Sequence, residues 1–278
     1  MSEYLVFASD LDETLLNKDH LIPKRNIDAI QKARTEYGIK FIPATGRGYS
    51  ATGRELKQLG LTDLAGEYVL SYNGGCLTEN KGNREIYFHA LPYEKVCEIV
   101  NFAKDLDVCI CIYTVKMIYM YHANDNERER KIGQGVDFCE LPDLDLSFLK
   151  ETPIAKIILQ NLDMAYLHSI EPLFAPIFAG CCSPTYSAGR YMEIVPAGVD
   201  KGKGLEKLSA LLGIPLSKFI VAGDSSNDLP MLQKAGLAVC PSNATDEVKA
   251  ICDYIAAADN NEGVIAEVME KFIFCDRT

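Results

Sequence analysis

YLVFASDLDETLL, residues 4–16, is the stretch that decides the fold. Residues 4–9 form a short apolar run, which is typical of a parallel strand buried on both faces. The run ends at Asp10 and Asp12, two carboxylates spaced two residues apart. Because open α/β sheets bind ligands at the carboxyl ends of their strands, we expect both carboxylates to lie in a binding crevice.

Strand and helix patterns alternate on both sides of this stretch. A helical pattern over 23–37 opens at Pro23 and closes at Gly38, and strand patterns follow at 39–43 and 68–72. The alternation returns after residue 200, with strands predicted at 219–222 and 237–240. This order predicts an α/β fold with a doubly wound, mainly parallel, Rossmann-like sheet.

The middle of the chain follows a different pattern. Hairpins and amphipathic helices mix over about 110 residues without regular alternation. We therefore predict a sheet core built from residues 1–80 and 190–278, interrupted by an inserted α+β domain at 81–189.

Composition excludes several classes of protein. The 278 residues are 48% hydrophobic and 24% charged, which is ordinary globular usage. A net charge of −11 argues against nucleic acid and anionic membranes as partners. No apolar run reaches the roughly 18–20 residues of a membrane span, and no basic segment precedes an apolar stretch at the start. Most of the ten cysteines lie in apolar stretches, which favours reduced, buried thiols and a cytoplasmic location.

A second acidic motif, GDSSND at 223–228, follows the strand predicted at 219–222. Asp224 and Asp228 would therefore meet Asp10 and Asp12 at one edge of the sheet. Carboxylates gathered in this way repel one another unless a cation neutralises them. An oxygen-rich set of ligands suits Mg²⁺.

Two further motifs carry groups suited to phosphate. ATGR at 44–47 follows the second strand, and DKGKG at 200–204 opens a helix. A threonine hydroxyl, a lysine and glycine-exposed amides at strand ends are the groups that bind a phosphate.

Four motifs occur in a fixed order along the chain: DLDETLL, ATGR, the lysine of VDKGKG, and GDSSNDLPML. In this order they resemble the haloacid dehalogenase superfamily, specifically Cof-type phosphatases with a large α/β cap. Asn73-Gly74-Gly75 and Glu262-Gly263-Val264 add support, and the resemblance covers essentially the whole chain. One departure is Glu13, where many members carry glycine. We expect the turn there to tolerate a side chain.

The resemblance implies a role for each matching residue. Asp10 would be the nucleophile that forms an aspartyl-phosphate, and Asp12 the general acid and base. Mg²⁺ would be held by Asp10, the Asp12 backbone carbonyl and Asp224, with support from Asp228. The phosphoryl oxygens would be bound by Thr45, the Gly46 amide, Lys201 and Asn227.

Several side chains have a second interpretation. Asp228 could simply cap the following helix, and Arg47 could contact substrate or lie on the surface. We interpret the second ATGR, at 51–54, as coincidence, since it follows no strand. The charged run 127–131 is expected to be a solvated face. Arg190 and Glu193 could face a pocket or form structural pairs.

Together these features predict a Mg²⁺-dependent phosphatase acting on a small phosphorylated metabolite such as a sugar phosphate. Two alternatives remain open. One is a phosphomutase on the same scaffold, and the other is a non-catalytic regulator that binds a phosphorylated metabolite.

Overall fold

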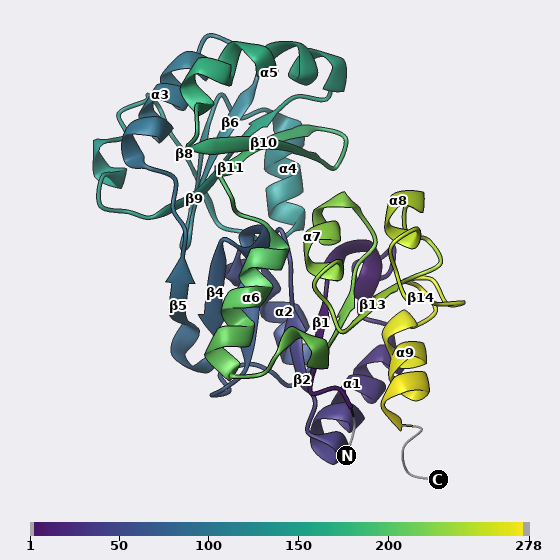
Figure 1. Cartoon of the computed structure of the whole chain (residues 1–278). Coiled ribbons are helices and arrows are strands. Elements are labelled where there is room, and N and C mark those ends of the chain that lie inside the picture. Colours follow the sequence, from purple (N-terminus) through teal and green to yellow (C-terminus); the bar gives the residue numbers. More distant parts are fainter. Residues whose placement is uncertain (1–2, 275–278) are drawn as a thin grey trace. The chain divides into compact units, whose positions relative to one another are not determined.

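The computed structural model describes residues 3–274, which form two compact units. We call the first the core unit; it comprises the described residues up to Tyr87 and from Asp200 onward. The second, the inserted unit, is Phe88–Val199. Each is described by itself below (Figure 1).

The core unit is built on a five-stranded sheet with the order β14-β13-β12-β1-β2. All its neighbouring strands pair in parallel. Its strands are β1 (Val6–Ser9), β2 (Lys40–Pro43), β12 (Phe219–Ala222), β13 (Leu237–Cys240) and β14 (Tyr254–Ile255). Strand β1 is therefore an interior strand between β2 and β12, whose carboxyl ends flank its own.

Helices cover both faces of this sheet because successive strand residues point to opposite sides. Phe7 of β1 packs with helices α1, α2 and α9. Val6 and Ala8 pack with helices α6, α7 and α8 on the other side. The helices are α1 (Lys24–Tyr37), α2 (Gly53–Gln58), α6 (Lys201–Leu212), α7 (Leu229–Leu232), α8 (Asp246–Lys249) and α9 (Val264–Phe272).

A smaller sheet completes the core unit. It has the order β3-β4-β5, with strands β3 (Tyr68–Ser71), β4 (Cys76–Glu79) and β5 (Arg84–Phe88). An isolated parallel bridge between Ala44 and Leu70 links β3 to the chain that leaves β2. This sheet therefore belongs with the core unit.

The inserted unit contains a six-stranded sheet with the order β10-β11-β9-β6-β7-β8. Its strands are β6 (Cys109–Thr114), β7 (Ile118–Tyr121), β8 (Phe138–Glu140), β9 (Ile154–Gln160), β10 (Cys182–Ser187) and β11 (Tyr191–Pro196). Helices α3 (Tyr93–Ala103) and α5 (Met164–Phe178) pack on one face, over Ile112, Ile157 and Ile194.

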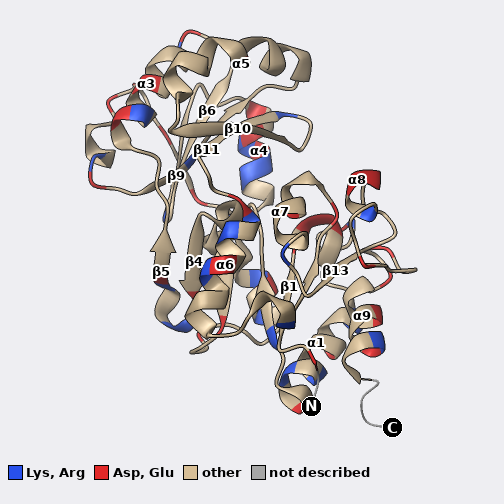
Figure 2. Ribbon diagram, viewed as in Figure 1, with Lys and Arg blue, Asp and Glu red and all other residues tan. Residues whose placement is uncertain are grey.

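Helix α4 (Asp125–Gly133) corrects one expectation from the sequence. Its residues carry both signs of charge (Figure 2), but the run is solvated only in part, because Glu129 is exposed whereas Glu127 and Lys131 are buried. Glu127 is 0% exposed and Lys131 is 2% exposed, and they pair at 2.6 Å. The hydroxyl of Tyr191, on β11, also donates to Glu127. The two charges are buried because they neutralise each other.

The structure confirms an α/β fold with a parallel core sheet and a separate, sheet-rich insert. The observed unit boundaries, after Tyr87 and after Val199, lie later in the chain than the predicted ones. The first shifts because β5, which follows residue 80, belongs to the small sheet of the core unit. The second shifts because β11 pairs with β9 and β10 of the inserted unit.

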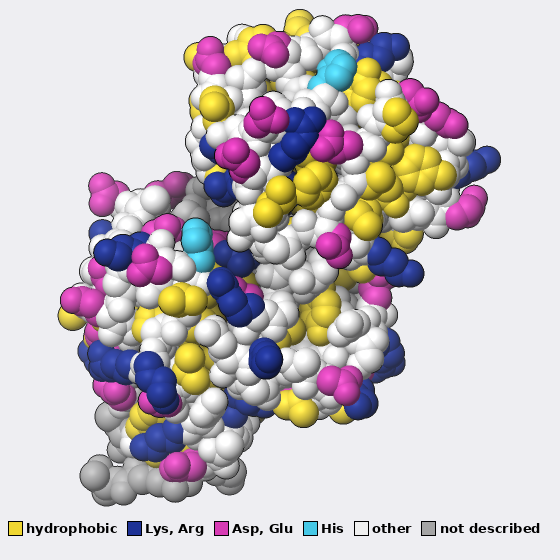
Figure 3. Space-filling view, turned by 180° about the vertical axis from the view of Figure 1, so that it is seen from behind, with side chains coloured by type: hydrophobic (Ala, Val, Ile, Leu, Met, Phe, Trp, Pro, Cys, Tyr) yellow, Lys and Arg dark blue, Asp and Glu magenta, His cyan; other side chains and the backbone are white. Residues whose placement is uncertain are grey.

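The surface shows no large region of a single charge in the view of Figure 3, where charged side chains of both signs alternate with apolar ones. Across residues 3–274, none of the helices has the length and apolar character to cross a membrane. The nine cysteines that the structure describes are all free thiols.

Candidate active site

Asp10 lies at the carboxyl end of β1, between the ends of β2 and β12. The backbone N–H of Asp10 donates to Ala222 O of β12 at 2.9 Å, so the residue continues the strand pairing. Its side chain is buried, with 6% of the residue exposed. After Asp10 the chain turns sharply, and Glu13 adopts φ 61° and ψ 2°. This left-handed backbone costs a non-glycine residue roughly 1–2 kcal/mol, so glycine would be accommodated there without strain.

The loop after β12 brings Asp224 and Asp228 to the same place. Asp228 Oδ2 accepts the backbone N–H groups of Asp224, at 3.0 Å, and Ser225, at 3.2 Å. Asp224 Oδ1 accepts the Thr14 hydroxyl at 2.7 Å. Gly223 is required here, because a Cβ at that position would lie 2.5 Å from Asp228 Cβ. Asp228 thus organises its own loop as well as contributing a carboxylate.

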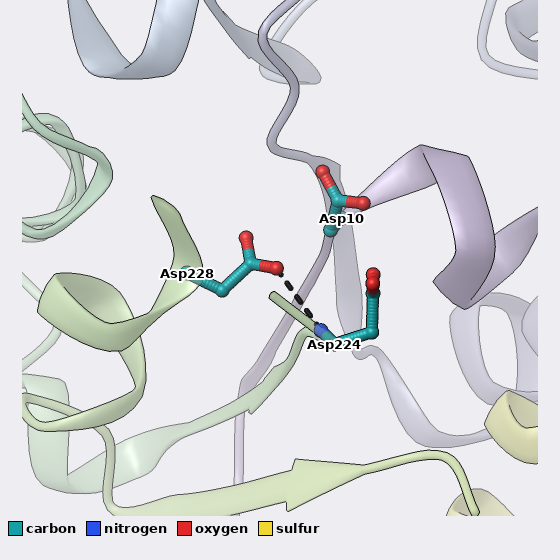
Figure 4. Close-up of side chains that lie close together, drawn as sticks. All are labelled: Asp10, Asp224 and Asp228. Atoms are coloured by element: carbon teal, nitrogen blue, oxygen red, sulfur yellow. Dashed lines mark hydrogen bonds between the residues drawn. The ribbon is translucent and has the colours of Figure 1, made fainter. Parts of the chain in front are cut away.

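Asp10, Asp224 and Asp228 form a buried carboxylate cluster (Figure 4). Each offers one oxygen, and these oxygens lie within 4.8 Å of one another. Lys201 reaches the cluster from the first turn of α6. Its Nζ lies 2.5 Å from Asp10 Oδ1 and 2.6 Å from Asp228 Oδ1, and the residue is 0% exposed.

The ionisation of these groups reflects burial and mutual charge. Burial raises the pKa of Asp10 well above its ordinary value; Lys201 opposes this rise, whereas Asp228 and Asp224 add to it. Burial also raises the pKa of Asp224, to about 7. For Lys201, burial disfavours the ammonium, but the Asp10 and Asp228 carboxylates raise its pKa above the ordinary value. The Lys201 ammonium therefore favours the charged form of Asp10, and the Asp10 and Asp228 carboxylates favour the charged form of Lys201.

The donor set fits a divalent cation. In their ionised forms, the three carboxylates beside one ammonium would carry two net negative charges in a buried space. All three ligands are oxygens, which hard divalent cations prefer. The raised pKa values of Asp10 and Asp224 are those expected of carboxylates whose charge still needs compensation.

The loop after β2 places Thr45 and Gly46 at the same edge of the sheet. Thr45 is 1% exposed, and its hydroxyl oxygen accepts the Arg47 backbone N–H at 3.0 Å. Gly46 lies against Asn73, since a Cβ there would come within 3.1 Å of Asn73 Oδ1. Asn227, from the β12 loop, donates through Nδ2 to that same Asn73 Oδ1 at 3.2 Å. The structure thus brings these predicted residues together, and Asn73 joins them.

Asp12 lies apart from the carboxylate cluster. Its carboxylate forms a two-point ion pair with Arg47, from Nε at 2.9 Å and from Nη2. The Asp12 side chain is 44% exposed, whereas that of Arg47 is 26% exposed. Arg47 is therefore held by Asp12 and does not simply lie on the surface.

Other side chains weighed from the sequence have structural partners. Thr52, in the second ATGR, is 0% exposed and its hydroxyl donates to Tyr49 O. In the inserted unit, Lys156 Nζ lies 2.5 Å from Glu193 Oε2, and Arg190 donates to Asn126. The sequence reasoning missed the contacts of Thr14 and Asn73, although Asn73 stands in a motif that it noted.

Comparison with known proteins identifies the family. The sequence profile of the haloacid dehalogenase-like hydrolases matches residues 7–269. The chain belongs to this family. It is therefore a hydrolytic enzyme, as the sequence predicted, of the superfamily's Cof type.

Similar proteins agree with this assignment. One is a haloacid dehalogenase-like hydrolase from Bacteroides thetaiotaomicron, whose sequence is 28% identical to this chain. Its crystal structure matches with a TM-score of 0.87, over 96% of this chain and 99% of that protein's chain. The 5-amino-6-(5-phospho-D-ribitylamino)uracil phosphatase YitU of Bacillus subtilis is 26% identical, over 97% of each chain.

A longer relative also matches. The chloroplastic endoribonuclease YBEY of Arabidopsis thaliana is 28% identical over 95% of this chain, which spans only 46% of that protein's length. The family and its phosphatase members support a phosphatase activity for this haloacid dehalogenase-like hydrolase.

Proposed function

We propose that this enzyme is a Mg²⁺-dependent phosphatase that hydrolyses a small phosphomonoester, such as a sugar phosphate, through an aspartyl-phosphate on Asp10. The observation that carries the proposal is the buried cluster of Asp10, Asp224 and Asp228 in contact with Lys201. It combines a carboxylate nucleophile, cation ligands and a fixed positive charge in one place.

In the first half-reaction, an Asp10 carboxylate oxygen bonds to phosphorus while the bond between phosphorus and the leaving alcohol oxygen breaks. Asp12 donates a proton to that oxygen. In the second half-reaction, water attacks phosphorus and gives its proton to Asp12. The bond between Asp10 and phosphorus then breaks, and inorganic phosphate leaves with Asp10 restored.

Two groups of residues assist these steps. Thr45, the Gly46 amide, Lys201 and Asn227 bind the phosphoryl oxygens, and Lys201 offsets the repulsion between Asp10 and the phosphate dianion. Asp10, the Asp12 backbone carbonyl and Asp224 hold Mg²⁺, with Asp228 in support. When bound, the ion stabilises negative charge on the phosphoryl group.

The ion pair with Arg47 holds the Asp12 side chain as a carboxylate, which is the form that can accept a proton. Asp12 is partly exposed in that pair, so its carboxylate can leave Arg47, and once it has taken up a proton it can act as the acid. Arg47 thus positions the ionised form of Asp12.

We further propose that the inserted unit acts as a cap that recognises the leaving group. In the chain, it lies between two segments that carry site motifs: the one that includes Asn73-Gly74-Gly75 and ends at Tyr87, and the one that begins at Asp200, directly before Lys201. The core residues above are committed to phosphate and cation, which leaves the alcohol part of the substrate to other side chains. The phosphatase YitU, by its name, acts on a small phosphomonoester, and this supports the same substrate class here.

The test is release of inorganic phosphate from an aryl phosphate, with and without Mg²⁺, followed by a panel of phosphorylated metabolites. The Asp10→Asn variant is the control for contaminating activity. We expect Mg²⁺-dependent release that Asp10→Asn abolishes. Conversion of one phosphoester into its isomer, without net phosphate release, would identify a phosphomutase instead.

A further inference from the structure

Residues Tyr72, Asn73 and Gly74, directly after β3, adopt left-handed backbone one after another, with φ of 52°, 53° and 89°. Such a run is unfavourable for residues with side chains and persists only where the surroundings hold it. Here the Tyr72 N–H donates to Arg47 O and the Asn73 N–H to Thr45 O, both at 3.0 Å. Two backbone hydrogen bonds thus join the strained segment to the ATGR loop.

The same segment also touches the loop that carries Lys201. A Cβ at Gly74 would lie 2.3 Å from Asp200 O and 3.2 Å from Lys201 Cα. Only glycine permits this approach, and its φ of 89° also favours glycine. The segment therefore packs between the ATGR loop and the start of α6.

The Asn73 side chain also contacts the loop after β12, which carries the third proposed phosphate-binding residue, Asn227. Its Oδ1 accepts the Asn227 Nδ2 hydrogen at 3.2 Å and lies beside Gly46. On the far side of that amide, the Ser225 hydroxyl donates to Asn227 Oδ1 at 2.8 Å. The two partners fix which end of the Asn227 amide is nitrogen, and they leave its second N–H as a donor.

We propose that Asn73 is a positioning residue for phosphate: it aims the second Asn227 N–H at the phosphoryl oxygens and sets the spacing between Asn227 and the Gly46 amide. This inference rests on the proposed function of Asn227 and Gly46. Without an acceptor at residue 73, the Ser225 hydroxyl is the remaining partner described for the Asn227 amide, and the phosphate loses a donor that two contacts orient.

A simpler explanation of Asn73 must be separated from this one. Asparagine tolerates left-handed backbone better than most residues, so its backbone preference alone could favour it here. Asn73→Gly distinguishes the two, because glycine keeps the left-handed backbone and removes only the side chain. Asn83 provides a matched control: it lies in the core unit, has φ 52°, and its Oδ1 accepts the Tyr49 hydroxyl.

The experiment measures the dissociation constant of inorganic phosphate by calorimetry in Mg²⁺ buffer, together with kcat and KM for an aryl phosphate. The variants are Asn73→Gly, Asn227→Ala, their double mutant and Asn83→Gly. We expect Asn73→Gly to weaken phosphate binding and raise KM by about 5- to 30-fold, with a smaller loss of kcat and little change in Tm. Asn83→Gly should stay within about twofold of wild type.

The double mutant tests whether Asn73 acts through Asn227. In the Asn227→Ala background, Asn73→Gly should cost less than about twofold more, since its target is already gone. Fully additive losses would show that Asn73 does not work through Asn227. Unchanged phosphate binding in Asn73→Gly would reduce its role to backbone geometry.

Two further measurements separate failure of this inference from failure of the proposed function and from poor folding of a variant. If Asn227→Ala itself leaves phosphate binding unchanged while Asp10→Asn abolishes turnover, then Asn227 is not a phosphate ligand, and the positioning inference fails while the phosphatase proposal stands. Asn73→Ala provides a second variant in case Asn73→Gly folds poorly. It removes the acceptor, as Asn73→Gly does, so it should weaken phosphate binding by at least as much. Phosphate affinity equal to wild type in Asn73→Ala would contradict the inference.

Discussion

Lys201 and Asp10 are 191 residues apart in the chain, yet Nζ of the lysine lies 2.5 Å from Oδ1 of the aspartate. The contact forms because β1 and the start of α6 meet at the carboxyl edge of one parallel sheet. It fixes a positive charge beside the proposed nucleophile.

Replacing Lys201 should therefore remove both binding and charge compensation. We expect Lys201→Met to lower kcat/KM for an aryl phosphate by at least about 100-fold, the size of effect seen when a transition-state donor is lost. The free energy of unfolding should also fall, by roughly 3–5 kcal/mol without metal, because Asp10 and Asp228 lose their buried partner. Urea unfolding and steady-state kinetics measure the two effects.

Lys203 is the matched control for Lys201. It lies on the same helix, its side chain is 53% exposed, and its distance to Asp200 is 3.7 Å. Lys203→Met should change neither quantity appreciably. Equal effects of the two substitutions would show that Lys201 has no special role.

The carboxylate cluster should make activity depend on a divalent cation. Excess chelator should abolish turnover, and Mg²⁺ should restore it. Asp224→Asn should shift the Mg²⁺ concentration for half-maximal activity upward by about tenfold or more, since it removes one charged ligand. Asp246→Asn, in the first turn of α8, should leave the Mg²⁺ titration unchanged. Full activity in excess chelator would refute the metal assignment.

Asp12 should matter most for substrates with poor leaving groups, because proton donation contributes most there. We predict that Asp12→Asn lowers kcat/KM for an alkyl phosphate at least about tenfold more than for an activated aryl phosphate, since kcat/KM covers the steps up to release of the alcohol and not the later hydrolysis that both esters share. Parallel assays of the two esters measure this ratio. An equal loss for both esters would argue against the role of Asp12 as the acid.

Arg47 should share this dependence on the leaving group. Arg47→Lys removes the two-point contact that a guanidinium makes with Asp12. It should lower alkyl phosphate turnover more than aryl phosphate turnover. The control is Arg54→Lys, in the second ATGR, whose side chain is 52% exposed and contacts the His20 carbonyl.

The buried pair of Lys156 and Glu193 should stabilise the inserted unit in a pH-dependent way. Burial acts to raise the pKa of Glu193. The Lys156 ammonium and the hydrogen bond from Ser187 lower this pKa by more than burial raises it, so the net shift is downward. A lowered carboxyl pKa contributes stability that is present above its unfolded pKa and is lost as pH falls through the folded value. The cost of Glu193→Gln should be roughly 3–5 kcal/mol near pH 7 and should shrink below about pH 4.

Chemical unfolding at several pH values tests this prediction. Glu140→Gln is the control, because Glu140 forms an ion pair with Arg128 and its side chain is 43% exposed. It should cost less than about 1 kcal/mol. A cost of Glu193→Gln that stays constant down to pH 3 would contradict the account.

The core of this fold was predictable because local signals agree there. The apolar run before Asp10 and the GDSSND loop after β12 each combine a buried strand with turn residues and carboxylates. The strands predicted at 219–222 and 237–240 have the predicted bounds for the same reason.

Other features depend on partners far along the chain, which a local pattern does not contain. Glu127 and Lys131 form a charged sequence run, but Tyr191, 64 residues from Glu127, helps to bury them. Strand β8 has only three residues and pairs with β7 across helix α4. Asn73 stands in a recognised motif, but its contact with Asn227 spans 154 residues.

The central claim is that Asp10 carries the phosphoryl group, and rapid acid quenching tests it most directly. The enzyme is mixed with a radiolabelled phosphomonoester in Mg²⁺ buffer, quenched within milliseconds, and digested for peptide mapping. We predict label on the peptide that contains Asp10, removable by hydroxylamine as an acyl phosphate is, and absent from Asp10→Asn. Label on another residue, or near-normal turnover by Asp10→Asn, would contradict the account.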